Sequence, residues 1–142
     1  MTRSTARIAC GFALLVLPAV ASAQQCLHGP DETAEQKARK REALSATRQV
    51  NTLQANHPDA RQGKFLNQAE MAVYYADLTK QKGTAGQPLI FDPASEVIPG
   101  WQLTLDNTDK GYWFMIKDKT DPCGFAYVSN QAGVIFTAEP IR

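Results

Sequence analysis

The sequence predicts an α+β fold in which a long N-terminal helix packs on a three- to four-stranded antiparallel meander, with a second short helix. Two changes of pattern along the chain predict this class. Apolar residues recur at spacings of three and four between residues 43 and 53, whereas they alternate at every second position from residue 101 onward. The links between the alternating segments are short, which favours antiparallel neighbours.

The first 23 residues have the pattern of a cleaved secretory signal peptide. Arg3 and Arg7 precede an apolar run over residues 8–20, and Ala-Ser-Ala at 21–23 is a small-x-small cleavage signal. A permanent membrane helix is the weaker alternative, because the run is shorter than the ~20 residues that cross a bilayer and contains Pro18. We therefore expect a single α+β domain over residues 24–142, periplasmic or secreted, with no membrane attachment after cleavage.

The net charge of the mature chain bears on its binding partners, and its two cysteines bear on whether it forms a disulfide. Cleavage removes Arg3 and Arg7 but no acidic residue, so the formal net charge changes from +1 to −1. A near-neutral domain has no electrostatic reason to bind nucleic acid or an anionic membrane. Cys26 and Cys123 remain, and two cysteines in an oxidising compartment favour a disulfide. A bridge between two chains through Cys26, or two free thiols, are the alternatives.

Two helices are predicted before residue 83. The first covers residues 32–56 with Asp31 as its N-cap, and Pro58 ends it. Its polar first half is expected to project into solvent, whereas its second half presents one apolar face, made by Ala43, Ala46, Val50 and Leu53. The second helix covers about residues 67–81, where Asn67 and Glu70 form a capping-box pattern.

The remainder of the chain predicts the sheet. Strands are expected at residues 101–106, 112–117, 124–129 and 134–138, and a proline-rich connector before them contains one short strand at best, at 89–91. Tyr112, Trp113 and Phe114 are contiguous, so at least one of them points away from the helix. Either a second layer covers that face of the sheet, or Trp113 and Tyr112 include an exposed binding residue. The unassigned apolar residues favour coverage; they are Tyr74, Tyr75 and Phe91.

Two stretches resemble the globular part of type IV pilins and type II secretion pseudopilins. Residues 43–54 and 63–72 are similar to the pilin region where the helix ends and a loop leads to a short leucine-bearing segment. Residues 100–137 present markers in the order of a pilin C-terminal sheet, among them Gly100-Trp101, Asp121-Pro122-Cys123 and the turn at 130–133. The chain lacks the long stem helix of pilins, so the resemblance implies a fold and does not by itself imply filament assembly.

No residue pattern predicts an enzyme. His28 and His57 lie in predicted loops without a serine or cysteine positioned as a nucleophile, and we interpret both as surface residues. Asp118 and Asp121 lie in a predicted turn, where aspartate is favoured for backbone reasons. Because pseudopilins bind calcium through β-loops, the resemblance implies these two aspartates as calcium ligands, and no other cofactor is expected.

A basic run lies in the first helix at Lys37, Arg39, Lys40 and Arg41. We interpret it as a solvated helix face, with an acidic polysaccharide or protein partner as the alternative. The sequence as a whole predicts an exported, non-catalytic, pilin-like binding or assembly-associated protein of unknown partner, with another protein as the candidate. The alternative is a secreted inhibitor or small-ligand-binding protein with a cystatin-like helix-on-sheet shape.

Overall fold

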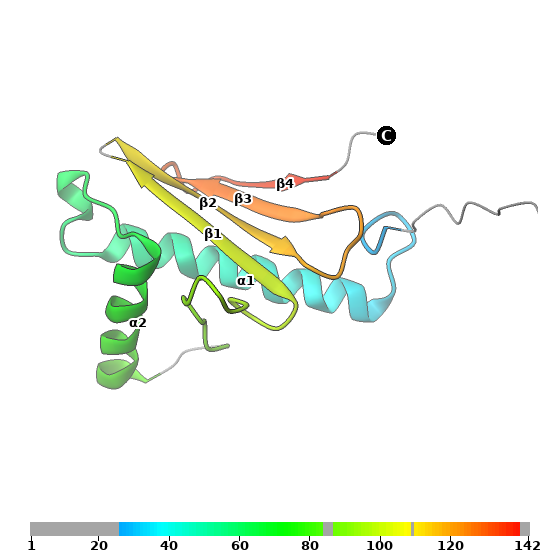
Figure 1. Cartoon of the computed structure of the whole chain (residues 1–142), viewed down its shortest axis with the longest axis horizontal. Coiled ribbons are helices and arrows are strands. Elements are labelled where there is room, and N and C mark those ends of the chain that lie inside the picture. Colours follow the sequence, from blue (N-terminus) through cyan, green and yellow to red (C-terminus); the bar gives the residue numbers. More distant parts are fainter. Residues whose placement is uncertain (1–25, 84–86, 109, 140–142) are drawn as a thin grey trace, which may run out of the picture.

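The structure, a computed structural model, describes residues 26–83, 87–108 and 110–139, and the predicted signal peptide lies outside them. The fold is α+β, as predicted, with one four-stranded antiparallel sheet in the order β1-β2-β3-β4 (Figure 1). Among the described residues, no helix has the length and hydropathy needed to cross a membrane. The elements are α1 (Ala34–Asn56), a 3₁₀ turn (Ala60–Gln62), α2 (Gln68–Lys82), β1 (Trp101–Thr108), β2 (Gly111–Asp118), β3 (Ala126–Asn130) and β4 (Ile135–Ala138).

Helix α1 begins at Thr33 rather than at the predicted cap Asp31. The Thr33 hydroxyl accepts a hydrogen bond from the Gln36 amide at 3.2 Å, and the Gln36 side chain accepts one from the Thr33 amide at 2.7 Å. This capping box satisfies two amides that the helix leaves without partners. Asp31 has Ala34 three residues later, which has no side-chain acceptor to complete such a box. The predicted start was therefore wrong by two residues.

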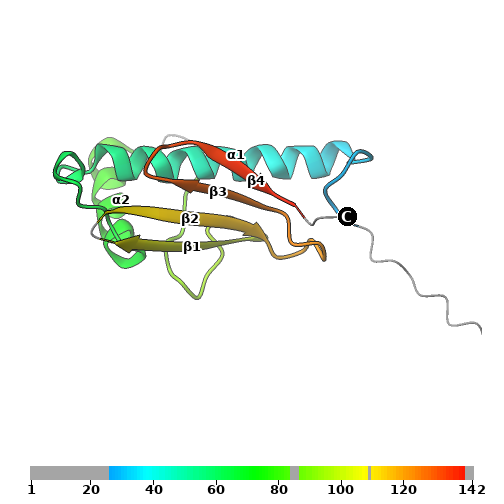
Figure 2. The same cartoon turned by 90° about the horizontal axis from the view of Figure 1, so that it is seen from above.

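The second half of α1 packs on one face of the sheet, as its apolar spacing predicted (Figure 2). Ala43, Ala46 and Val50 are at most 1 % exposed. The strands face them with an alternating set of large apolar side chains, which includes Trp101, Leu103, Phe114, Ile116 and Tyr127. One polar side chain of α1 is also enclosed: the Gln54 amide donates to the carbonyl of Leu66 and accepts from its amide.

Helix α2 has the predicted capping box between Asn67 and Glu70, and it lies on the same side of the sheet as α1 (Figures 1 and 2). Its apolar side chains contact the connector that leads to β1: Tyr75 packs edge-to-face on Phe91 at 5.4 Å, and its hydroxyl accepts from the Leu89 amide. The prediction that these aromatic residues form a second layer over the opposite face of the sheet was therefore wrong. Tyr75 and Phe91 pack instead on the side of the sheet where the helices lie. Residues 89–91 also form no regular strand.

The pairing of β1 with β2 decides to which face of the sheet Tyr112, Trp113 and Phe114 point. The two strands pair from Trp101 with Asp118 to Thr108 with Gly111, so β1 extends two residues beyond its predicted end. On β2 the side chain of Phe114 is fully buried, whereas Trp113 between Tyr112 and Phe114 is 42 % exposed. Asp118 ends β2 on the same face as Phe114 and is buried under the N-terminal half of α1.

Candidate functional site

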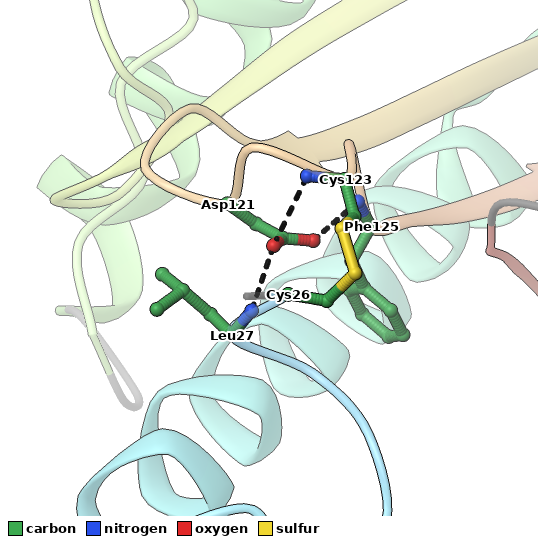
Figure 3. Close-up of a disulfide and its surroundings, with 5 residues drawn as sticks. All are labelled: Cys26, Leu27, Asp121, Cys123 and Phe125. Carbon is green, nitrogen blue, oxygen red and sulfur yellow. Dashed lines mark hydrogen bonds between the residues drawn. A yellow bond between two sulfur atoms is a disulfide. The ribbon is translucent and has the colours of Figure 1, made fainter. Parts of the chain in front are cut away.

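A disulfide joins Cys26 to Cys123, as predicted, and ties the segment before α1 to the loop between β2 and β3 (Figure 3). The Cα atoms of the two cysteines are 5.2 Å apart across a sequence separation of 97. The Asp121 carboxylate reinforces the tie by accepting from three backbone amides: Leu27 at 2.8 Å, Phe125 at 2.9 Å and Cys123 at 3.3 Å. Burial alone would raise the pKa of Asp121, but these hydrogen bonds outweigh it and lower the pKa.

His28 lies directly beyond this tie and is buried, so its interpretation as a surface residue was wrong. Its Nε2 is 2.9 Å from a carboxylate oxygen of Asp118, and its Nδ1 is 3.2 Å from one of Glu32. The ring packs against Phe125 at 4.5 Å between centroids. Sequence reasoning missed the site because Asp118 lies 90 residues away along the chain. The one signal was the position of His28 two residues after a cysteine that pairs with the same distant loop.

Asp118 is the centre of a charged cluster between α1 and the end of β2. It accepts from the amide and hydroxyl of Thr120 at 2.8 and 2.7 Å, and an Arg39 guanidinium nitrogen lies 3.3 Å away. Burial alone would raise the pKa of Asp118, but hydrogen bonds from His28 and Thr120 outweigh it and lower the pKa. The charge of Arg39 acts in the same direction. Arg39 therefore anchors the polar half of α1 and is not part of a freely solvated face.

The His28–Asp118 pair supports a structural role. The two side chains are 2 % and 0 % exposed, so a substrate has no access to the contact between them. The carboxylate oxygens of Asp118 and Asp121 accept hydrogen bonds from protein groups. Within residues 26–83, 87–108 and 110–139, no group of three or more His, Cys, Asp or Glu side chains could hold a metal ion. Calcium binding by the two aspartates stays a prediction that this geometry does not support.

The face of the sheet opposite the helices carries apolar side chains. Trp113 and Phe136 are 42 % and 55 % exposed. Met115 pairs with Val128, and Val128 pairs with Phe136, so these three side chains form one row across β2, β3 and β4. We call this set, with Trp113, the outer apolar face. Tyr112 points the other way: it is 5 % exposed, and its hydroxyl donates to the Asn51 side chain. Of the two predicted binding residues, only Trp113 is available at the surface.

A cleft of about 380 Å³ opens on the helix side, between the first half of α1 and β3. Its lining in the described part of the chain consists of Glu32, Lys37, Lys40, Arg41 and Tyr127. Lys40 is not free, since its ammonium group lies 2.7 Å from Glu32 and 4.7 Å from the centroid of the Phe125 ring. The four residues of the basic run therefore have two roles. Arg39 and Lys40 pair with the buried carboxylates of Asp118 and Glu32, whereas Lys37 and Arg41 face this cleft.

Comparison of the chain with protein-family models, with curated proteins and with solved structures found no match.

Proposed function

We propose that this protein is an exported, non-catalytic assembly module that associates with a second copy of itself through the outer apolar face and strand β4. The observation that carries the proposal is the exposure of Trp113 and Phe136 on a sheet face that no helix of the described chain covers. Contiguous apolar side chains at a surface are typical of interaction sites. Self-association through this face would suit a pilin-like subunit that takes part in an assembly outside the cytoplasm.

Export and a non-catalytic role have separate support. The cysteine pair fits an oxidising compartment, in which disulfides persist, and the N-terminal sequence pattern fits a signal peptide. His28 and Asp118 are buried, and their side chains contact Phe125 and Thr120 rather than an open surface. A binding role needs no reactive group and relies only on the accessible surface.

The second copy is the favoured partner because β4 is an edge strand without a proline or a charged side chain, two of the features that normally prevent edge pairing. Residues 136–138 are exposed, and the shortness of the strand limits the strength of such pairing. The opposite edge is partly covered, since Gln102 of β1 donates to the carbonyls of Pro93 and Ser95. Antiparallel pairing of β4 with β4 of another copy is self-complementary. It would extend the sheet and make the two outer apolar faces continuous.

Sedimentation velocity of the mature protein tests the proposal. We expect a monomer–dimer equilibrium between about 1 and 300 μM, because the edge is short and a small interface gives weak association. Phe136→Lys should shift the protein to monomer by placing a charge on the edge strand. Ile90→Lys is the matched control, because Ile90 is exposed to a similar degree, 51 % against 55 %, but lies outside the sheet. A wild-type monomer at all concentrations, or equal effects of both substitutions, would refute self-association.

A second candidate function is favoured by a different observation. The cleft beside α1 is an open depression whose described lining consists of three basic side chains, one carboxylate and one tyrosine. It supports the alternative of a secreted small-ligand-binding protein. This function would not require the outer apolar face.

A further inference from the structure

The described side chains that line the cleft between α1 and β3 carry more positive than negative charge. Three basic side chains and one carboxylate line it in the described part of the chain. The carboxylate, Glu32, already accepts from Lys40 at 2.7 Å and faces His28 at 3.2 Å. Lys37 and Arg41 have no carboxylate partner among the described residues. They lie four residues apart, on the same face of α1.

The geometry of Arg41 leaves its binding groups available. Its Nε donates to the Lys37 carbonyl at 3.3 Å, which fixes the side chain along the helix. The two terminal guanidinium nitrogens have no partner in the described residues. A guanidinium held in this way can present two parallel N–H groups to an oxyanion.

Tyr127 supplies a third donor from the opposite wall of the cleft. Its ring belongs to the core, stacked on Trp101 and edge-on to Phe125, so that only 6 % of the residue is exposed. Tyr127 lines the cleft, and none of the hydrogen bonds between described residues involves its hydroxyl. This hydroxyl is not among the fully enclosed side-chain atoms that lack a partner. Burial raises the pKa of Tyr127, as do the charges of Glu32 and Glu139, so the hydroxyl keeps its proton at neutral pH.

From these groups we infer that the cleft binds a small molecule through one oxyanion group, a carboxylate, phosphate or sulfate. Lys37 and Arg41 would supply the charge, and the Tyr127 hydroxyl would donate to the same group from the sheet side. A volume of about 380 Å³ is within the range of small-ligand sites. This inference gives the ligand class of the second candidate function. It does not depend on self-association through the outer apolar face.

Nuclear magnetic resonance titration of the mature protein tests the inference, with inorganic phosphate, sulfate and citrate as separate probes at constant ionic strength. At least one probe should give saturable shifts of the amides around Lys37, Arg41 and Tyr127. For that probe, Lys37→Gln/Arg41→Gln should weaken binding by about tenfold or more, because charge-assisted hydrogen bonds are lost. Tyr127→Phe, which keeps the ring in the core, should weaken it by about threefold through the loss of one neutral donor.

The matched control removes the same charge elsewhere. Arg61→Gln/Lys80→Gln changes two exposed basic residues outside the cleft, and it should leave the affinity unchanged. An equal loss in both double variants would show that overall charge attracts the ions, which would overturn the inference. Linear, unsaturable shifts with all three probes would overturn it as well. Because Phe136→Lys leaves the cleft intact, failure of self-association and failure of oxyanion binding remain distinguishable.

Discussion

Removal of the Cys26–Cys123 disulfide should cost this domain a large part of its stability. The disulfide closes a loop with a sequence separation of 97. In the chain-entropy account, cross-linking a loop of this length destabilises the unfolded state by about 4.7 kcal/mol at 25 °C. Domains of this size have a free energy of unfolding of only about 5–15 kcal/mol. The variant Cys26→Ser/Cys123→Ser should therefore fold but be marginal.

The contacts around the disulfide indicate that its removal acts on the unfolded state rather than on the folded one. In the folded protein the amide of Leu27 donates to Asp121, and His28 lies against Asp118; neither contact involves the sulfur atoms, so we expect both to persist in the variant. The segment before α1 should therefore stay packed on the β2–β3 loop in the folded variant. The loss of stability should come from a more expanded unfolded chain. Urea unfolding followed by tryptophan fluorescence measures both quantities. We expect a lower midpoint and a steeper dependence on urea, because more surface becomes exposed on unfolding.

Reduced wild-type protein provides the control and should match the double serine variant. A loss of less than about 1 kcal/mol with an unchanged urea dependence would refute the entropic reasoning, since closure of a loop of this length predicts several times that value. A large loss accompanied by disorder of residues 26–33 would instead place the effect in the folded state.

Three further changes test the buried polar groups and one close backbone approach. The pKa of Asp118 is below its ordinary value of 3.8 in the folded protein, so its contribution to stability is complete above about pH 4 and is lost as the pH falls further. Asp118→Asn should cost about 1.5–3 kcal/mol at pH 7, because it removes the buried carboxylate that accepts from Thr120 and pairs with Arg39, and it should make the urea midpoint less sensitive to acid. Gly100→Ala should destabilise more than Gly63→Ala in urea unfolding, although both glycines have positive φ. An added Cβ at residue 100 would lie 2.6 Å from the terminal Arg39 nitrogen and would displace it from Asp118, whereas at residue 63 it meets nothing within 4 Å. Gln54→Met should cost about 2–4 kcal/mol in urea unfolding, because it leaves two buried backbone groups without partners; a change below about 0.5 kcal/mol would contradict this reasoning.

Local patterns predicted much of the fold because they depend on neighbouring residues. The spacing of Ala43, Ala46, Val50 and Leu53 placed the buried face of α1 correctly. The Asn67–Glu70 capping box located the start of α2, and the alternation from Trp101 onward located the sheet. The start of α1 was harder to locate from sequence, since two polar residues close together could each cap a helix. The reciprocal bond from Gln36 decided for Thr33.

The candidate sites were less predictable because each joins distant segments. His28, Arg39 and Asp118 are individually ordinary polar residues, and only the packing of α1 against the end of β2 brings them into one cluster. The cleft depends in the same way on Tyr127 facing the α1 cations from another element. Nothing in the local pattern distinguishes a lysine that is paired from one that is free.

The amino-acid sequence alone determined the fold class and the buried face of α1, because hydrophobic periodicity and capping chemistry act over short distances. The cysteine count favoured a Cys26–Cys123 pair but left a bridge between two chains and two free thiols open. Only the tertiary structure decided which face of the sheet stays open and which charges are neutralised. Those outcomes depend on where α2 and the segment before α1 dock. Docking is a sum of many weak long-range contacts, and it leaves no periodic pattern along the chain.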